Sequence, residues 1–138
     1  MTDTRLLLHS LRLQVRWGDM DALGHVNNAE YLRYFEQSRV EWLDGLGCRT
    51  TRTGTGPILA GMTLNYRKPI VYPSEIEIRI HPAKLGNTSF TIASEIVNGR
   101  DAGERFAEGE FVIVWLDYDV GKSVRVPDHL RAVLAGQS

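Results

Sequence analysis

The sequence has little of several features that define other protein classes. Its 138 residues include one cysteine, Cys48, so an internal disulfide is excluded. A single thiol without metal-ligand residues beside it is typical of a reducing compartment, and we expect it to be buried or unreactive. No apolar run approaches the length of a membrane span. The start of the chain is acidic, with only three consecutive leucines, and is not typical of a signal peptide. We therefore expect a cytoplasmic protein.

Charge of one sign is also not in excess. Lys and Arg together number 16 and Asp and Glu 17, for a formal net charge of −1. This balance gives no general electrostatic reason to bind nucleic acid or an anionic membrane. The sequence also has no zinc-ligand spacing, no phosphate-binding glycine loop and no Ser/His/Asp order. We predict a single domain over residues 1–138 that uses no metal and no cofactor.

The most informative stretch of the chain is residues 15–46, which predict a strand, a loop between glycines and one long helix over 28–46. Asn27 is a suitable N-cap because its side-chain oxygen can accept the amide of the second or third helical residue. Glu30 is placed to reach back in the manner of a capping box. Glu36 and Arg39 are three residues apart, and we expect them to pair. The predicted apolar face contains Tyr31, Leu32, Phe35, Trp42, Leu43 and Leu46.

The rest of the chain is mainly strands. Residues 47–57 are rich in Thr and Gly and predict a loop. A short amphipathic helix is predicted from Pro127 to Gly136. The expected architecture is α+β, one long helix before four largely antiparallel strands, with the first strand in the same sheet. The five strands are predicted at 6–17, 58–66, 75–81, 88–97 and 106–116.

The loop before the long helix contains residues suited to acyl transfer. If Asn27 caps the helix, the amide of Asn28 is left free at the helix start. Such an amide, together with the helix dipole, can stabilise a developing oxyanion. The carboxylate of Asp21 could attack an activated carbonyl or deprotonate a water that does. The alternative is that these residues are only solvated turn formers or helix caps, as aspartates before helices commonly are.

Residues 17–39, WGDMDALGHVNNAEYLRYFEQSR, resemble the active-site segment of the hotdog-fold acyl-CoA thioesterases, the 4-hydroxybenzoyl-CoA thioesterase-like family. The shared features are an aromatic residue, a D-x-D motif, a glycine, an N-Y-L-like step and an aromatic-E-x-x-R. Three later segments are similar to the same family in the same order: YRKP at 66–69, KLGNTSF at 84–90 and RFAEGE at 105–110.

This resemblance implies a hotdog fold, an antiparallel sheet wrapped around one long central helix. It also implies hydrolysis of acyl-CoA to free acid and coenzyme A, in a homodimer or homotetramer with active sites between subunits. The catalytic acid of the family corresponds to Asp21, and the helix-start amide that polarises the thioester corresponds to Asn28. Asp19 corresponds to a supporting or solvated residue.

Two positions depart from the family pattern. Many bacterial members have a histidine where this chain has Asn28, so any proton transfer by that histidine is missing here. The segment from His25 to Asn28 is instead similar to the H-V-N-N of plant acyl-carrier-protein thioesterases, in which an aspartate four residues before the histidine also acts. In that family an asparagine lies between the aspartate and the histidine, and this chain has Leu23 at that position. His25 is a candidate to orient water or Asp21, or to hydrogen-bond a loop carbonyl.

Six further residues are assigned to substrate or coenzyme A binding. The basic residues suit the phosphates of coenzyme A, although exposed basic side chains are often merely solvated. Trp17 is a candidate for an acyl pocket, and Gly24 and Ser89 belong to the resembling motifs. The residues are Trp17, Gly24, Arg67, Lys68, Lys84 and Ser89.

Two other functions remain open at this stage. One is a hotdog hydratase or dehydratase acting on acyl-CoA, whose aspartate–histidine pair has a different spacing. The other is an acyl-CoA-binding module without turnover, because Leu23 and Asn28 replace functional residue types of relatives. The sequence does not distinguish aromatic, short, branched or long acyl groups, or coenzyme A from acyl carrier protein.

Overall fold

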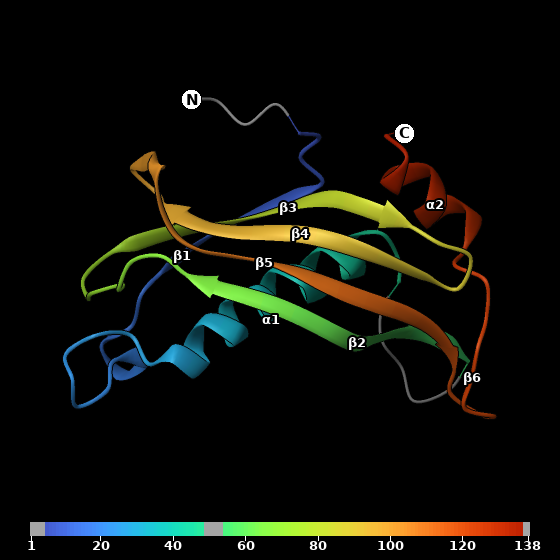
Figure 1. The fold of residues 1–138 in the computed structure, drawn as a ribbon, viewed down its shortest axis with the longest axis horizontal. Helices are drawn as coiled ribbons and strands as arrows, with labels where there is room; N and C mark the ends of the chain where they lie inside the picture. Colours follow the sequence, from blue (N-terminus) through green and yellow to red (C-terminus); the bar gives the residue numbers. More distant parts are fainter. Residues whose placement is uncertain (1–4, 49–53, 137–138) are drawn as a thin grey trace.

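The chain folds into a long helix and a sheet that curves around it (Figure 1). The computed structural model describes residues 5–48 and 54–136. The elements of this part of the chain are β1 (His9–Gln14), a 3-10 turn (Trp17–Asp19), α1 (Asn28–Gly45), β2 (Thr55–Tyr66), β3 (Glu75–Leu85), β4 (Ser89–Asn98), β5 (Asp101–Asp117), β6 (Lys122–Ser123) and α2 (Asp128–Leu134). The strands form one antiparallel sheet in the order β1-β3-β4-β5-β2, and β6 pairs with the end of β5.

This arrangement confirms the expected α+β hotdog fold, with the first strand in the same sheet as the others. Helix α1 begins at the predicted residue, Asn28. Several predicted strand boundaries are wrong. Strand β1 covers His9–Gln14 instead of 6–17, and β3 runs to Leu85 instead of residue 81. Strand β2 already begins at Thr55, inside the predicted loop 47–57, and β5 begins at Asp101 instead of residue 106. Strand β2 starts earlier because Thr55 already pairs with Asp117 of β5, and β5 starts earlier because Asp101 pairs with Asn98 of β4. Residues 49–53 of the predicted loop lie outside the described residues.

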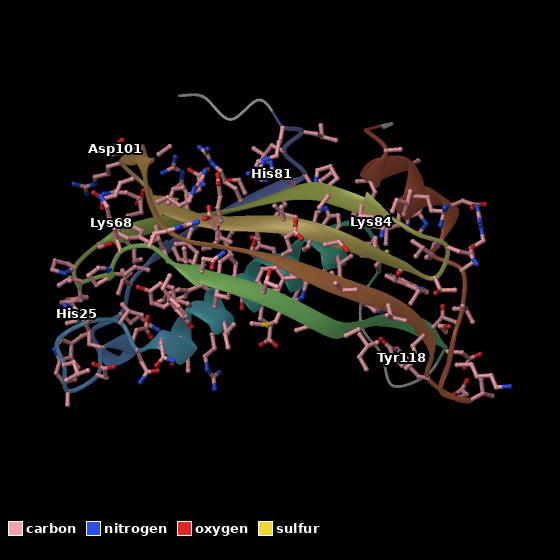
Figure 2. All side chains as sticks on the ribbon, in the orientation of Figure 1. His25, Lys68, His81, Lys84, Asp101 and Tyr118 are labelled. Atoms are coloured by element: carbon pink, nitrogen blue, oxygen red, sulfur yellow. The ribbon has the colours of Figure 1, made fainter. Side chains whose placement is uncertain are left out.

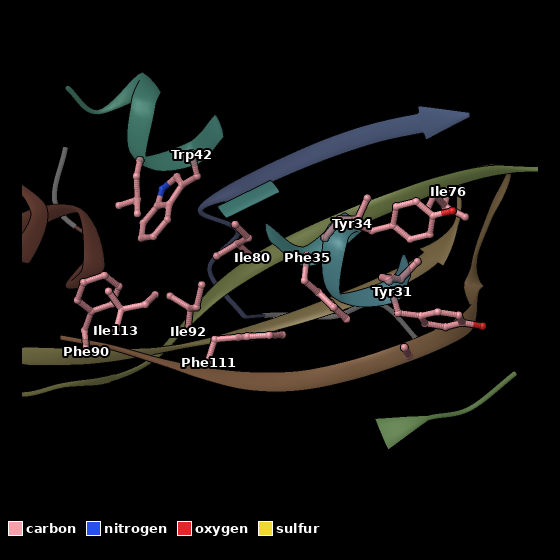
Figure 3. Packing of buried hydrophobic residues seen from close by; sticks show 14 of the residues in the cluster. Tyr31, Tyr34, Phe35, Trp42, Ile76, Ile80, Phe90, Ile92, Phe111 and Ile113 are labelled. Atoms are coloured by element: carbon pink, nitrogen blue, oxygen red, sulfur yellow. The ribbon is translucent and has the colours of Figure 1, made fainter. Parts of the chain in front are cut away.

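The core lies between α1 and the concave face of the sheet. The alternating isoleucines of β3 face α1 and are fully buried, as their spacing predicts. Phe35 of α1 packs against Phe111 of β5, with ring centroids 5.0 Å apart, and Trp42 packs edge-on against Phe90 of β4 at 6.2 Å (Figure 3). These contacts fix α1 across the sheet and so fix where its N-terminus lies.

The buried face of α1 differs from the predicted apolar face. Leu32 was predicted in that face but is 37% exposed. Tyr34 and Ser38 occupy the buried face instead, because the helix turns these positions toward the sheet whatever their polarity. Within the described residues, neither helix is both long and apolar enough to span a bilayer.

Candidate active site

The loop before α1 is a small hairpin that presents Asp21. Met20 and Val26 form an antiparallel bridge, and the amide of Asp21 donates to the carbonyl of His25 at 2.9 Å. Gly24 has a φ of +82°, a conformation that L side chains rarely adopt, so the turn requires glycine there. The amide of Val26 donates to the carbonyl of Ile70 at 2.8 Å and ties the loop to the segment after β2.

Asn27 caps α1 as predicted. Its side-chain Oδ1 accepts the amide of Ala29 at 2.8 Å. The predicted capping box is wrong, because the amide of Asn27 donates to the carbonyl of Asp19 at 2.9 Å and the side chain of Glu30 lies beside Arg33 instead. Among the described residues, the amide of Asn28 makes no hydrogen bond. One donor is therefore left at the positive end of the helix dipole.

Asp19 is a buried supporting residue. Only 4% of its surface is exposed, and its Oδ2 accepts the Tyr34 hydroxyl at 2.7 Å and the amide of Arg16 at 3.1 Å. Burial, and then the hydrogen bond to Asp19, raise the pKa of Tyr34 well above its ordinary value. The phenol therefore stays protonated and acts as a donor. Since the carbonyl of Asp19 also holds Asn27, this carboxylate and its backbone lock the loop to the helix start.

Asp21 and Asn28 both line one cleft of about 410 Å³. Asp21 is half-buried, and its Oδ1 accepts the amide of Leu23 at 2.9 Å, which holds the carboxylate in place. The cleft lies where the loop, the start of α1 and the end of β2 meet (Figure 2). Its lining consists of Asp21, Leu23, His25, Val26, Asn28, Tyr31, Tyr66, Arg67, Lys68 and Pro69.

Two tyrosines support the cleft, and the sequence reasoning did not assign them this role. The Tyr66 hydroxyl donates to the carbonyl of Asn28 at 2.9 Å. The Tyr31 hydroxyl donates to the carbonyl of Lys68 and accepts the amide of Ile70, each at 3.1 Å. The two rings meet edge to face with centroids 4.9 Å apart. The available signal was Tyr66 itself, an aromatic residue at the end of a strand that leads into Arg67, Lys68 and a proline.

The two basic residues of the cleft differ in how well they are neutralised. Arg67 is paired with Glu108, which also accepts from Arg105. Burial alone would raise the pKa of Glu108, but the hydrogen bonds from Arg67 and Arg105 outweigh it and hold the pKa below its ordinary value. Lys68 lies 4.0 Å from Glu104 and is more than half exposed. Lys68 is therefore the freer of the two cations to meet an anionic ligand.

The structure brings together five of the predicted site residues and leaves four outside the cleft. His25 lies at its edge with an exposed side chain. Trp17 is 75% exposed on the 3-10 turn and does not line the cleft. Gly24 shapes the loop without lining the cleft. Lys84 and Ser89 lie at the opposite end of the sheet, as the positions of Lys84 and His25 in Figure 2 show.

The profile of the Thioesterase-like superfamily matches residues 15–134 of this chain. The chain belongs to this superfamily. Long-chain acyl-CoA thioesterase FadM of Escherichia coli is 26% identical over 125 residues, which cover 89% of this chain and 94% of FadM. Residues 15–134, which match the superfamily profile, include every residue that lines the cleft. The predicted resemblance to thioesterases is thus confirmed at the level of the family.

Solved structures of the superfamily share the fold. The PA2801 protein of Pseudomonas aeruginosa is 34% identical, with a TM-score of 0.90 over 94% of this chain and 99% of its own. A 1,4-dihydroxy-2-naphthoyl-CoA thioesterase from Synechocystis is 14% identical, with a TM-score of 0.81 over 92% of this chain and 95% of its own. At 14% identity, the similarity to the Synechocystis protein concerns the fold alone. Together they confirm that the sheet and central helix are those of the thioesterase hotdog fold.

Proposed function

We propose that this protein hydrolyses an acyl-CoA thioester to the free acid and coenzyme A. Membership of the Thioesterase-like superfamily supports thioester hydrolysis as the class of reaction. The observation that carries the proposal is the pairing, in one cleft, of a half-buried carboxylate with an uncommitted helix-start amide. A thiolate is a better leaving group than an alkoxide or amine, so these two groups suffice without a nucleophile–histidine–acid triad.

The amide of Asn28 polarises the thioester carbonyl. As the tetrahedral intermediate forms, negative charge grows on the carbonyl oxygen and is stabilised by this donor and by the positive end of the α1 dipole. The gain is largest in the transition state, as catalysis requires. Tyr66 acts as a positioning residue, because its hydrogen bond to the carbonyl of the same residue holds the first helical turn in place.

Asp21 supplies the reacting carboxylate. It either takes a proton from the attacking water or attacks the carbonyl carbon itself, and the second route gives an anhydride that water then opens. Both routes release the thiolate and end in the same products. The amide of Leu23 donates to Oδ1 of Asp21, and among the described residues no donor is bonded to its Oδ2. His25 remains a candidate to orient water at the cleft edge.

Coenzyme A binding is assigned first to Lys68 and Arg67, which line the cleft. Lys84 and Ser89 lie at the far end of the sheet, so they contact the same ligand only if a second copy of the chain supplies them. Trp17 and Gly24 belong to the loop that borders the cleft. An acyl carrier protein is the alternative to coenzyme A as the carrier of the acyl group.

The proposal also includes a cytoplasmic location.

We further propose that the chain forms a homodimer or homotetramer. Strand β2 is an edge of the sheet and leaves backbone groups unpaired on one side. Apolar side chains are exposed on this strand and on the adjacent face of α1, which together form a surface suited to a second copy. They are Leu32, Val40, Ile58, Leu59 and Met62.

Release of free thiol from a panel of acyl-CoAs tests the proposal. Steady turnover with at least one acyl chain length supports it, and comparison across chain lengths defines the acyl preference. A hydratase would instead change the absorbance of an enoyl-CoA. A binding module would take up ligand and do neither, and either of these results would overturn the proposed hydrolysis.

A further inference from the structure

A second cavity of about 450 Å³ lies between the C-terminal half of α1 and the N-terminal half of β2. Three residues of the proposed contact with a second copy, Val40, Ile58 and Leu59, also line it, so the cavity borders that contact. Its walls are largely apolar, with Val40 and Leu43 on the helix side and Ile58 and Leu59 on the strand side. Its residues have no part in the chemistry assigned to the first cleft. The full lining is Glu36, Arg39, Val40, Leu43, Asp44, Cys48, Pro57, Ile58, Leu59 and Ile113.

Both cavities lie along the same side of α1. Asn28, Leu32, Glu36 and Val40 recur at intervals of four residues, so they form one stripe along α1. The stripe starts in the first cleft and ends in the second cavity, and from Asn28 to Glu36 it covers eight residues, about 12 Å of helix at 1.5 Å per residue. Leu32, which is exposed, is the residue of this stripe between the two cavities. An acyl chain whose carbonyl lies at Asn28 would follow this stripe past Leu32 to reach the second cavity.

Arg39 is the cation of this cavity. Its guanidinium lies 5.6 Å from the centre of the Phe111 ring. The predicted Glu36–Arg39 ion pair is wrong: among residues 5–48 and 54–136 the guanidinium has no hydrogen bond and no carboxylate within 4.0 Å. Burial lowers the pKa of Arg39, and the charge of Glu36 opposes this shift only in part. Among the described residues, Arg39 is thus a partly desolvated donor without a hydrogen-bond acceptor, and it lines a cavity whose walls are largely apolar.

We infer that this cavity holds the far end of the acyl group, and that Arg39 makes the enzyme prefer acyl groups with a hydrogen-bond-accepting oxygen at that end. The inference rests on the proposed function, which puts the thioester at Asn28. Arg39 lines the cavity with its guanidinium over Phe111, and the Cα–Cβ bonds of a helix tilt toward its N-terminus, the end at which the thioester is placed. A plain hydrocarbon would leave this donor without a partner, which is costly in a desolvated site.

The charges of the cavity favour a neutral acceptor. Among the described lining residues, the carboxylate of Glu36 shares this space with Arg39. A hydroxyl or carbonyl oxygen accepts from the guanidinium without being repelled by that carboxylate. A terminal carboxylate would meet both attraction and repulsion.

The test uses thioether analogues of coenzyme A, which bind but cannot be hydrolysed. S-alkyl-CoA, S-(ω-hydroxyalkyl)-CoA and S-(ω-carboxyalkyl)-CoA of six to twelve carbons are titrated by calorimetry into the wild-type protein and the Arg39→Met variant. Methionine keeps an unbranched stem over Phe111 and removes the donors. We expect the hydroxyl probe to bind the wild type about tenfold more tightly than the alkyl probe of the same length, the usual scale for a hydrogen bond to a charged group. The advantage should disappear in Arg39→Met.

A matched control and an activity measurement complete the design. Arg33→Met changes an arginine of the same helix that is exposed beside Glu30 and does not line the cavity, and it should keep the wild-type preference. An Arg39-dependent gain for the carboxylate probe would support the inference and identify the acceptor as an anion. Equal binding of all probes, or a preference that survives in Arg39→Met, would overturn it. Hydrolysis of the acyl-CoA panel is followed separately. Turnover of any member together with equal binding of the probes defeats this inference alone. Discrimination between the probes without turnover of any member defeats the proposed function alone.

Discussion

The hydroxyl of Tyr66, at the end of β2, donates a hydrogen bond to the carbonyl oxygen of Asn28, the first residue of α1, at 2.9 Å. This bond joins the edge strand to the peptide unit directly after the amide that we assign to the thioester carbonyl. The Tyr31 hydroxyl stabilises the same region, because it donates to the carbonyl of Lys68 and accepts the amide of Ile70, on either side of Pro69. The first helical turn, with the amide that we propose as the oxyanion donor, is therefore held by the sheet as well as by the helix.

Tyr66→Phe should lower kcat while leaving KM nearly unchanged. The substitution removes the hydroxyl and keeps the ring against Tyr31, so the cleft keeps its shape but the first helical turn is less firmly held. We expect a loss of about tenfold or less, the scale of one neutral hydrogen bond. Steady-state kinetics checks this. A rise in KM with unchanged kcat would instead show that Tyr66 contacts the substrate.

Asn28→Ala and Asn28→Pro separate the backbone of this residue from its side chain. Alanine keeps the amide, so turnover should stay within about tenfold of wild type. Proline removes the donor and should cost on the order of a hundredfold in kcat, the usual loss for one oxyanion donor. Proline suits the first helical position, and Asn27 before it is already extended at φ −57° and ψ 137°, as a residue before proline must be. An inactive alanine variant with a proline variant no worse would assign the role to the side chain.

Asp21→Asn should abolish thioester hydrolysis without unfolding the protein. The amide oxygen can still accept the Leu23 amide, but the side chain can neither attack nor take a proton. We expect kcat/KM to fall by about a thousandfold or more, with an unchanged thermal midpoint and retained binding of a CoA thioether. Asp128→Asn, an exposed aspartate of α2, is the matched control and should keep wild-type turnover. Near-normal turnover of Asp21→Asn would remove this residue from the mechanism.

The edge strand β2 should be the contact between two copies. Replacing Leu59 and Met62 together by Glu places charges on its exposed apolar surface, and we expect the oligomer to dissociate. Light scattering at micromolar concentration measures the change, and Val120→Glu, in an exposed turn elsewhere, is the control. A wild-type protein that is monomeric and fully active under these conditions would contradict the proposal.

Acid should destabilise the fold through Glu77, which is buried on the outer side of β3. Burial alone would raise its pKa, but hydrogen bonds from Arg79 and Ser10 and the charge of Arg12 outweigh it and hold the pKa below the ordinary 4.5. Because the folded-state pKa is the lower one, this contribution to stability is complete above about pH 4.5 and is lost as pH falls through the folded-state pKa.

Urea unfolding between pH 6 and pH 3 tests this prediction. The free energy of unfolding of wild type should fall more steeply below about pH 4.5 than that of Glu77→Gln, by at most about 1.4 kcal/mol per pH unit for one proton. Parallel curves for the two proteins would show that Glu77 titrates alike in both states. Glu110→Gln, an exposed glutamate of β5, is the control and should follow wild type.

Local chemistry in the sequence was enough to predict α1, its cap and the position of Asp21. The cap at Asn27 and the free amide of Asn28 depend on the few residues around the helix start, and the isoleucine alternation of β3 depends on the strand repeat alone. Contacts between distant segments were not predictable in this way. Only the tertiary structure places the Tyr66 hydroxyl at the carbonyl of Asn28 and Lys84 at the far end of the sheet. It also places Arg39 in the lining of a cavity, where it does not pair with its predicted partner Glu36. These relationships depend on the pairing of β2 with β5 and on the packing of α1 across the sheet, which join residues that no short-range sequence pattern connects.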